Sequence, residues 1–76
     1  MPKLPIVKAD KLIKALKKNG FFHDRTVGSH MVFYHPVKHK TVSIPQHGNK
    51  DLGKGLVKGV LNDAEITIEE FIKLLH

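Results

Sequence analysis

The spacing of apolar residues predicts a helix near the start of the chain. Between positions 8 and 19, apolar side chains recur at intervals of three or four residues, while lysines occupy most of the remaining positions. Gly20 follows directly, where a glycine in the left-handed conformation commonly ends a helix. Lys17 and Lys18 precede it, where the helix dipole favours positive charge. We therefore expect an amphipathic helix over residues 8–19.

The pattern then changes to the alternation that is typical of strands. Strand-like runs cover residues 21–26, 30–35 and 41–44. Gly28 and Pro36 separate these runs and mark turns between them. In the second run Met31 and Phe33 share one face, and Val32 and Tyr34 share the other. The pattern predicts an antiparallel meander with one face in the core and the other partly open.

Two further helices are expected in the second half of the chain. After a loop over residues 46–50, apolar side chains recur with a helical period over residues 52–64. Interior glycines weaken this helix, so its start could also lie near Gly55. Thr67 and Glu70 then have the spacing of a capping box, which predicts a short, peripheral last helix.

This order of elements predicts an α+β fold in two layers, with three antiparallel strands between helices. The length of 76 residues permits one small hydrophobic core, so we interpret residues 1–76 as a single domain. The chain has no cysteine, which is usual for proteins of the reducing cytoplasm. It also has no uninterrupted apolar stretch of signal or membrane-spanning length, so we expect a cytoplasmic protein without membrane contact.

Most of the chain has a net positive charge, whereas its last part has a net negative charge. Residues 1–61 hold twelve lysine and arginine residues against three aspartates, a net charge of +9. Residues 62–76 hold one lysine against four acidic residues, a net charge of −3. A basic body of this kind favours a polyanion such as RNA as the partner, although a well-solvated basic surface would give the same count.

Six histidines are the most unusual feature of the composition: His23, His30, His35, His39, His47 and His76. A metal site is the first alternative to consider. The spacing of two histidines four apart on a predicted helix, which catalytic zinc sites favour, is absent. His30, His35 and His39 fall on a strand, its end and a hairpin, without evident convergence. We therefore predict no metal and no other cofactor.

Other catalytic arrangements fit the sequence poorly. Acidic residues are scattered rather than paired, and Ser29 lacks the following glycine and helix of a nucleophile elbow. His30 remains, on a strand directly after a Gly-Ser turn. An imidazole can take a proton from a ribose 2′-hydroxyl near neutral pH, and nearby lysines can stabilise the charged phosphorane without a metal. The residues alone favour the plainer interpretation of His30, because most histidines on strands are partly buried polar residues without a catalytic role.

Several separated motifs carry a resemblance to a known family. They are Gly20-Phe21, Arg25 followed by Gly28-Ser29-His30, Phe33-Tyr34-His35-Pro36, Pro45-Gln46-His47 and Lys54-Gly55. In this order and spacing the chain resembles the HicA family of RNA-cutting toxins along nearly its whole length. The chain departs from many relatives at Leu56-Val57 and at Gly59, which bears on substrate contacts more than on the signature histidine.

The resemblance implies a fold, an activity and a partner. The fold would be α-β-β-β-α, like a double-stranded-RNA-binding domain, with helices packed on one face of a three-stranded antiparallel sheet. The activity would be that of an endoribonuclease toxin that cleaves messenger RNA, with His30 in the position of the catalytic histidine. The partner that neutralises it would be a HicB-type antitoxin.

Further RNA contacts are assigned to Ser29, Tyr34, His47, Lys54 and Lys58. Tyr34 shares a strand face with His30 and is the better candidate for stacking on a base, because Phe21 and Phe33 are expected in the core. His47 could instead be a structural histidine that closes the loop after Pro45. Two rival functions use the same charge and fold: a non-catalytic RNA-binding module and a protein-interaction domain.

Overall fold

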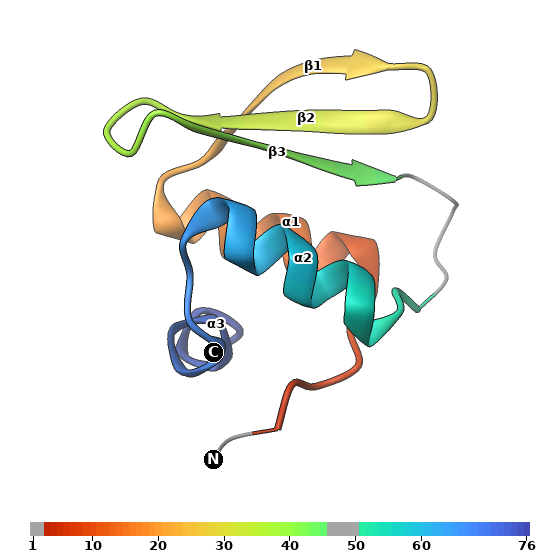
Figure 1. Ribbon diagram of the computed structural model, residues 1–76, viewed down its shortest axis with the longest axis vertical. Coiled ribbons are helices and arrows are strands. Elements are labelled where there is room, and N and C mark those ends of the chain that lie inside the picture. Colours follow the sequence, from red (N-terminus) through yellow and green to blue (C-terminus); the bar gives the residue numbers. More distant parts are fainter. Residues whose placement is uncertain (1–2, 46–50) are drawn as a thin grey trace.

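The computed structural model describes residues 3–45 and 51–76, and along these ranges one helix is followed by a three-stranded meander and two further helices (Figure 1). The elements are α1 (Ala9–Asn19), β1 (Phe22–Val27), β2 (His30–His35), β3 (Lys40–Pro45), α2 (Lys54–Ala64) and α3 (Ile68–Leu74). The elements follow one another in the predicted order, and no strand begins or ends more than one residue from its predicted position. The helix α2 begins at Lys54, between the two starts that the sequence predicted.

The strands form one antiparallel sheet in the order β1-β2-β3, and α1 and α2 lie on one of its faces (Figure 1). Phe33 on β2 is paired with Val42 on β3, and both side chains belong to the buried core. Ile44 joins them from the same side of β3. In the described part of the chain, no helix lies on the opposite face. The expected α+β fold with helices on one face of a three-stranded sheet is therefore confirmed.

The C-terminal end of α1 has the predicted geometry. Gly20 adopts φ of 119°, in the region that glycine enters at low cost. The N–H of Gly20 donates to the carbonyl of Lys17 at 3.1 Å, and the N–H of Phe21 donates to that of Leu16 at 3.0 Å. These bonds satisfy carbonyl groups that the end of a helix leaves without partners. The chain thereby reverses into β1 while Phe21 stays buried in the core.

The last helix is part of the core, so the expectation of a peripheral helix is wrong. Its start has the predicted capping box: Glu70 N–H donates to Thr67 Oγ1 at 3.1 Å, and Thr67 N–H donates to Glu70 Oε1 at 3.3 Å. The ring of Phe71 is fully buried in the hydrophobic cluster that α1 and α2 also line. α3 therefore closes the side of the helical layer that faces away from the sheet (Figure 1).

Candidate functional site

A two-residue turn brings His30 to the first position of β2. β1 ends at Val27, and Gly28 and Ser29 connect it to His30. Gly28 has φ of 59°, whereas Ser29 does not have a positive φ, which is the pattern of a type II′ turn with glycine at its first position. A Cβ atom on Gly28 would meet no other atom within 4 Å, so glycine is required there by the backbone conformation alone.

His30 is exposed on the face of the sheet that carries no helix. It is paired with Val27 on β1 and with Pro45 on β3. Because Phe33 faces the helices, the alternation of a strand places His30 and Tyr34 on the opposite side. The prediction that Tyr34 and His30 share a face is thus confirmed. No hydrogen bond joins the imidazole of His30 to another residue in the described part of the chain.

We call this side of the sheet the open face. Three cross-strand rows make it up: Val27-His30-Pro45, Arg25-Val32-Ser43 and Phe22-Tyr34-Thr41. A register shift in β1 lies between His23 and Arg25. Residues three apart on a regular strand point to opposite sides, so this bulge is what brings Phe22 and Arg25 to the same face. The open face therefore carries an imidazole, a guanidinium and two aromatic rings.

Phe22 is a residue of this face that the sequence interpretation missed. Its side chain is 46% exposed, and its ring meets that of Tyr34 edge to face with the centroids 5.9 Å apart. The hydroxyl group of Tyr34 shares a hydrogen bond of 3.1 Å with Nδ1 of His39. The signal was present in the sequence, because Phe21 and Phe22 are adjacent at the start of a strand and alternation sends only one of them into the core.

The remaining predicted RNA contacts are not gathered around His30. Ser29 is exposed in the turn beside it. Lys54 and Lys58 are exposed on α2, which lies in the helical layer on the other side of the sheet. The first turn of α2 contains no acidic residue, and Gly53 provides no side-chain cap, so this helix end favours anions. His47 lies outside the described residues.

His35 has a structural role on the helix side of the sheet. Its side chain is buried, and Nε2–H donates to the carbonyl of Asn19 at 3.1 Å. Its Nδ1 accepts from the backbone N–H groups of Val37 and Lys38 at 3.2 and 3.1 Å. Alternation directs His35 and His30 to opposite faces. Among the described residues, no group of three histidine or acidic side chains lies close enough to hold a metal ion.

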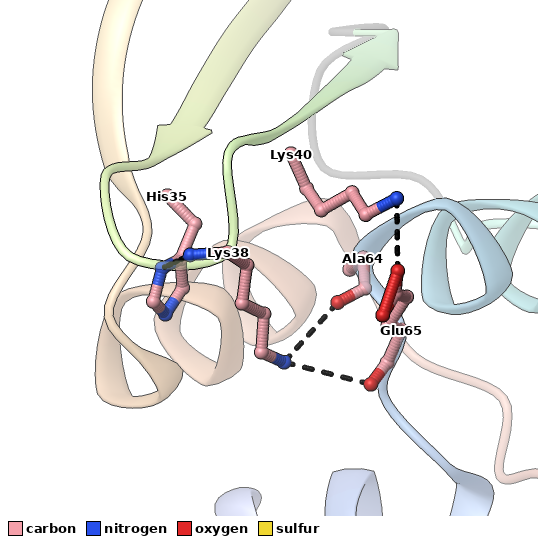
Figure 2. A network of polar contacts seen from close by, with 5 residues as sticks. All are labelled: His35, Lys38, Lys40, Ala64 and Glu65. Atoms are coloured by element: carbon pink, nitrogen blue, oxygen red, sulfur yellow. Dashed lines mark hydrogen bonds and ion pairs between the residues drawn. The ribbon is translucent and has the colours of Figure 1, made fainter.

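A second polar cluster ties the β2–β3 hairpin to the helix ends (Figure 2). Lys38 Nζ donates to the carbonyls of Ala64 and Glu65, at 3.2 and 3.5 Å, and to Asn19 Oδ1 at 3.3 Å. Lys40 Nζ lies 2.8 Å from Glu65 Oε2. Their hydrogen bond, followed by their mutual attraction, lowers the pKa of Glu65 and raises the pKa of Lys40. This cluster lies at the end of the sheet opposite His30 and links the β2–β3 hairpin to the ends of α1 and α2.

Comparison with known proteins adds one finding to this geometry. Residues 9–66 match the model of a family described as the HicA toxin of bacterial toxin-antitoxin systems. The matched segment runs from the start of α1 to just beyond α2 and includes the whole open face. None of the curated proteins matches the chain. In the described ranges, no helix is long and apolar enough to cross a membrane.

Proposed function

Because the chain belongs to the HicA toxin family of bacterial toxin-antitoxin systems, we propose that it is an endoribonuclease toxin that cuts messenger RNA with His30 as its catalytic residue. The single observation that carries the proposal is the position of His30. It is the histidine exposed on the open face directly after the Gly28-Ser29 turn, within the segment that matches the family. His35 is buried, and both of its ring nitrogens are engaged within the protein.

The imidazole of His30 would act as a general base toward the ribose. It takes the proton of the 2′-hydroxyl, the 2′-oxygen forms a bond to the adjacent phosphorus, and the bond from phosphorus to the 5′-oxygen breaks. The leaving 5′-oxygen receives a proton from the imidazolium or from water. Such proton transfer contributes roughly 10² to 10⁴ in rate. Arg25, on the neighbouring row of the open face, is the nearest described cation in register that could stabilise the charged phosphorane.

The partner of a toxin in such a pair is an antitoxin, and we propose one of the HicB type that covers His30. A complex of this kind would keep RNA away from His30. The net charge of +6 favours a partner whose contact surface is acidic, because complementary charge speeds association. Co-expression with the product of the adjacent small gene should give a co-purifying complex and restore growth of the cells. If the two proteins elute separately and growth stays arrested, the proposed antitoxin partner would be contradicted.

The catalytic proposal is tested by comparing the wild-type protein with His30→Ala. Cleavage of a long single-stranded RNA, followed on a gel with a chelator present, should fall at least 100-fold, a change on the order expected for a lost general base. Circular dichroism and urea unfolding should show equal folding, because an exposed histidine without a described hydrogen bond adds little stability. His76→Ala, which removes another exposed histidine, is the matched control and should cleave normally.

Two results would redirect the assignment. Equal cleavage by wild type and His30→Ala would remove His30 from the mechanism. Cleavage that disappears only in the chelator would point to a metal site instead.

The placement of Lys54 and Lys58 in the helical layer favours one second candidate function, that of a non-catalytic module that binds duplex RNA through its helices. That module would bind duplex more tightly than single strands and would cleave neither.

A further inference from the structure

We propose that the open face holds an unpaired base of single-stranded RNA against Tyr34 and Phe22, a few nucleotides from the phosphodiester at which His30 acts as the general base. This inference rests on the proposed function and assigns it a base-binding subsite. Phe22 and Tyr34 face each other across β1 and β2 in the row farthest from His30. Aromatic rings exposed on a sheet are suitable platforms for nucleic acid bases, because every base has a flat π-face.

The two rings are held in place before any base arrives. Phe22 meets Tyr34 edge to face, and the hydroxyl of Tyr34 is fixed by His39 at 3.1 Å. Phe22 is 46% exposed, and Tyr34 is half-buried. A ring whose orientation is already set loses less conformational freedom when it binds. Nearly half of the surface of Phe22 stays in contact with water in the folded protein. A base stacked on the ring would cover this exposed apolar surface.

The spacing along β2 fits a strand of RNA that runs across the sheet. Tyr34 follows His30 by four positions along β2, which corresponds to roughly 13 Å of extended chain. Arg25 lies in the row between them, where a phosphate of the intervening backbone would pass. Arg25 pairs with Asp24 at 2.5 Å, but both side chains are largely exposed, at 61% and 41%, so solvent screens this pair and a phosphate can replace it.

The composition of the open face favours single-stranded RNA over a duplex or a protein. Bases in a duplex are stacked on one another, so they cannot lie flat on Tyr34. A protein interface would be favoured by a contiguous apolar patch. Here the two exposed apolar residues of β1, Phe22 and Val27, are separated by the row that contains Arg25 and Ser43.

The chain contains its own reporter for this subsite. Tyr34 is the only tyrosine, and there is no tryptophan, so intrinsic fluorescence reports on Tyr34 alone. We would titrate His30→Ala, which binds without cleaving, with a single-stranded oligoribonucleotide, with a duplex of the same sequence, and with a strand whose bases are removed at internal positions. Saturable quenching is expected with the first probe and is expected to be much weaker with the other two.

Variants of Phe22 test whether stacking contributes to affinity. In the His30→Ala background, Phe22→Leu keeps an apolar side chain but loses the ring, and it should weaken binding of the single strand by roughly 5- to 150-fold, the range for one stacked base. Val37→Ala, which truncates an apolar side chain that is 81% exposed outside the open face, is the matched control and should bind normally. Labelled oligonucleotide anisotropy measures both affinities independently of Tyr34.

Each outcome separates this inference from the catalytic proposal. Binding without quenching, equal quenching by the duplex, or unchanged affinity in Phe22→Leu would overturn the subsite. Quenching by the antitoxin but not by RNA would identify the open face as a protein-docking surface and would also overturn it. Cleavage that persists in His30→Ala would refute only the catalytic role, because fluorescence measures binding. If single-stranded RNA does not quench Tyr34 fluorescence but cleavage still depends on His30, only the base-binding subsite would be refuted.

Discussion

Gly20 and His35 are packed so closely that a Cβ atom on Gly20 would lie 2.6 Å from Nε2 of His35. The same Nε2 donates to the carbonyl of Asn19, so the imidazole is fixed against the end of α1. The backbone of Gly20 is also left-handed, with φ of 119°. Two independent constraints therefore select glycine at this position: the space that the ring occupies and the conformation that the end of the helix requires.

We predict that Gly20→Ala destabilises the protein by about 2 to 4 kcal/mol, since it combines overpacking with an unfavourable φ. Urea unfolding followed by circular dichroism measures the change. Gly59→Ala is the matched control: Gly59 lies inside α2, where a Cβ atom would meet nothing within 4 Å. That variant should gain about 0.4 to 1 kcal/mol. Equal effects of the two substitutions would show that the contact with His35 is unimportant.

We predict that Lys38→Met destabilises the fold by about 1 to 3 kcal/mol, because it leaves the carbonyls of Ala64 and Glu65 without their partner. Methionine keeps the apolar stem and so isolates the loss of the ammonium group. Lys14→Met is the control, since Lys14 is exposed on α1 and forms no hydrogen bond within the described residues. Thermal unfolding of both variants gives the comparison, and equal midpoints would contradict the role of Lys38.

Acid should weaken the start of α3 through Glu70. The backbone N–H of Thr67, and then its side chain, hydrogen-bond the carboxylate and lower the pKa of Glu70 from 4.5. A carboxyl whose pKa is lower in the folded state adds stability that is complete above the unfolded value and is lost as the pH falls through the folded value. Stability should therefore decrease below about pH 4.5 in part through this group.

The variant Glu70→Gln isolates that contribution. Glutamine can still accept from the Thr67 N–H and so preserves the capping box, but it does not titrate. We expect the difference in unfolding free energy between wild type and Glu70→Gln to narrow as the pH is lowered from neutrality into the acid range. Parallel curves across this range would show that Glu70 does not contribute to the acid sensitivity.

Salt should weaken RNA binding steeply if phosphates supply most of the affinity. The lysines of α1 and α2 are exposed, and the described open face has few cations besides Arg25. Affinity of His30→Ala for a long single-stranded RNA should fall by orders of magnitude between about 50 and 200 mM salt if several phosphates are neutralised. The slope should become shallower in Lys54→Gln if that lysine contacts a phosphate. A flat salt response would rule out phosphate-dominated binding.

The fold was predictable because local signals agreed with one another. The structure confirms three of these signals. The period of the apolar residues predicted α1, the glycine after it predicted where α1 ends, and the capping box at Thr67 predicted where α3 begins. The contribution of α3 to the core was not predictable. A short amphipathic segment has the same sequence pattern whether it packs at the edge of the domain or buries an aromatic ring in the core. Only the placement of α1 and α2 creates the space that Phe71 fills.

The site was predictable only in part, because register is not visible in a sequence. Alternation within one strand correctly placed His30 and Tyr34 on one side. The contribution of β1 depends on the irregularity between His23 and Arg25, which changes the side to which every earlier residue points. Lys54 and Lys58 were assigned to RNA from the motifs alone, and the structure places them on α2, in the layer on the other side of the sheet.

The burial of Phe71 also limits how the protein can be shortened. The segment shared with the family ends at Ile66, whereas Phe71 lies five residues later and is among the largest fully buried side chains. A chain cut after Ile66 would lose α3, and the core would either be opened to water or keep a void the size of the phenyl ring of Phe71, at a cost of about 3 to 5 kcal/mol. The segment that matches the family is therefore shorter than the stretch of chain that builds the core, and an expression vector should include α3.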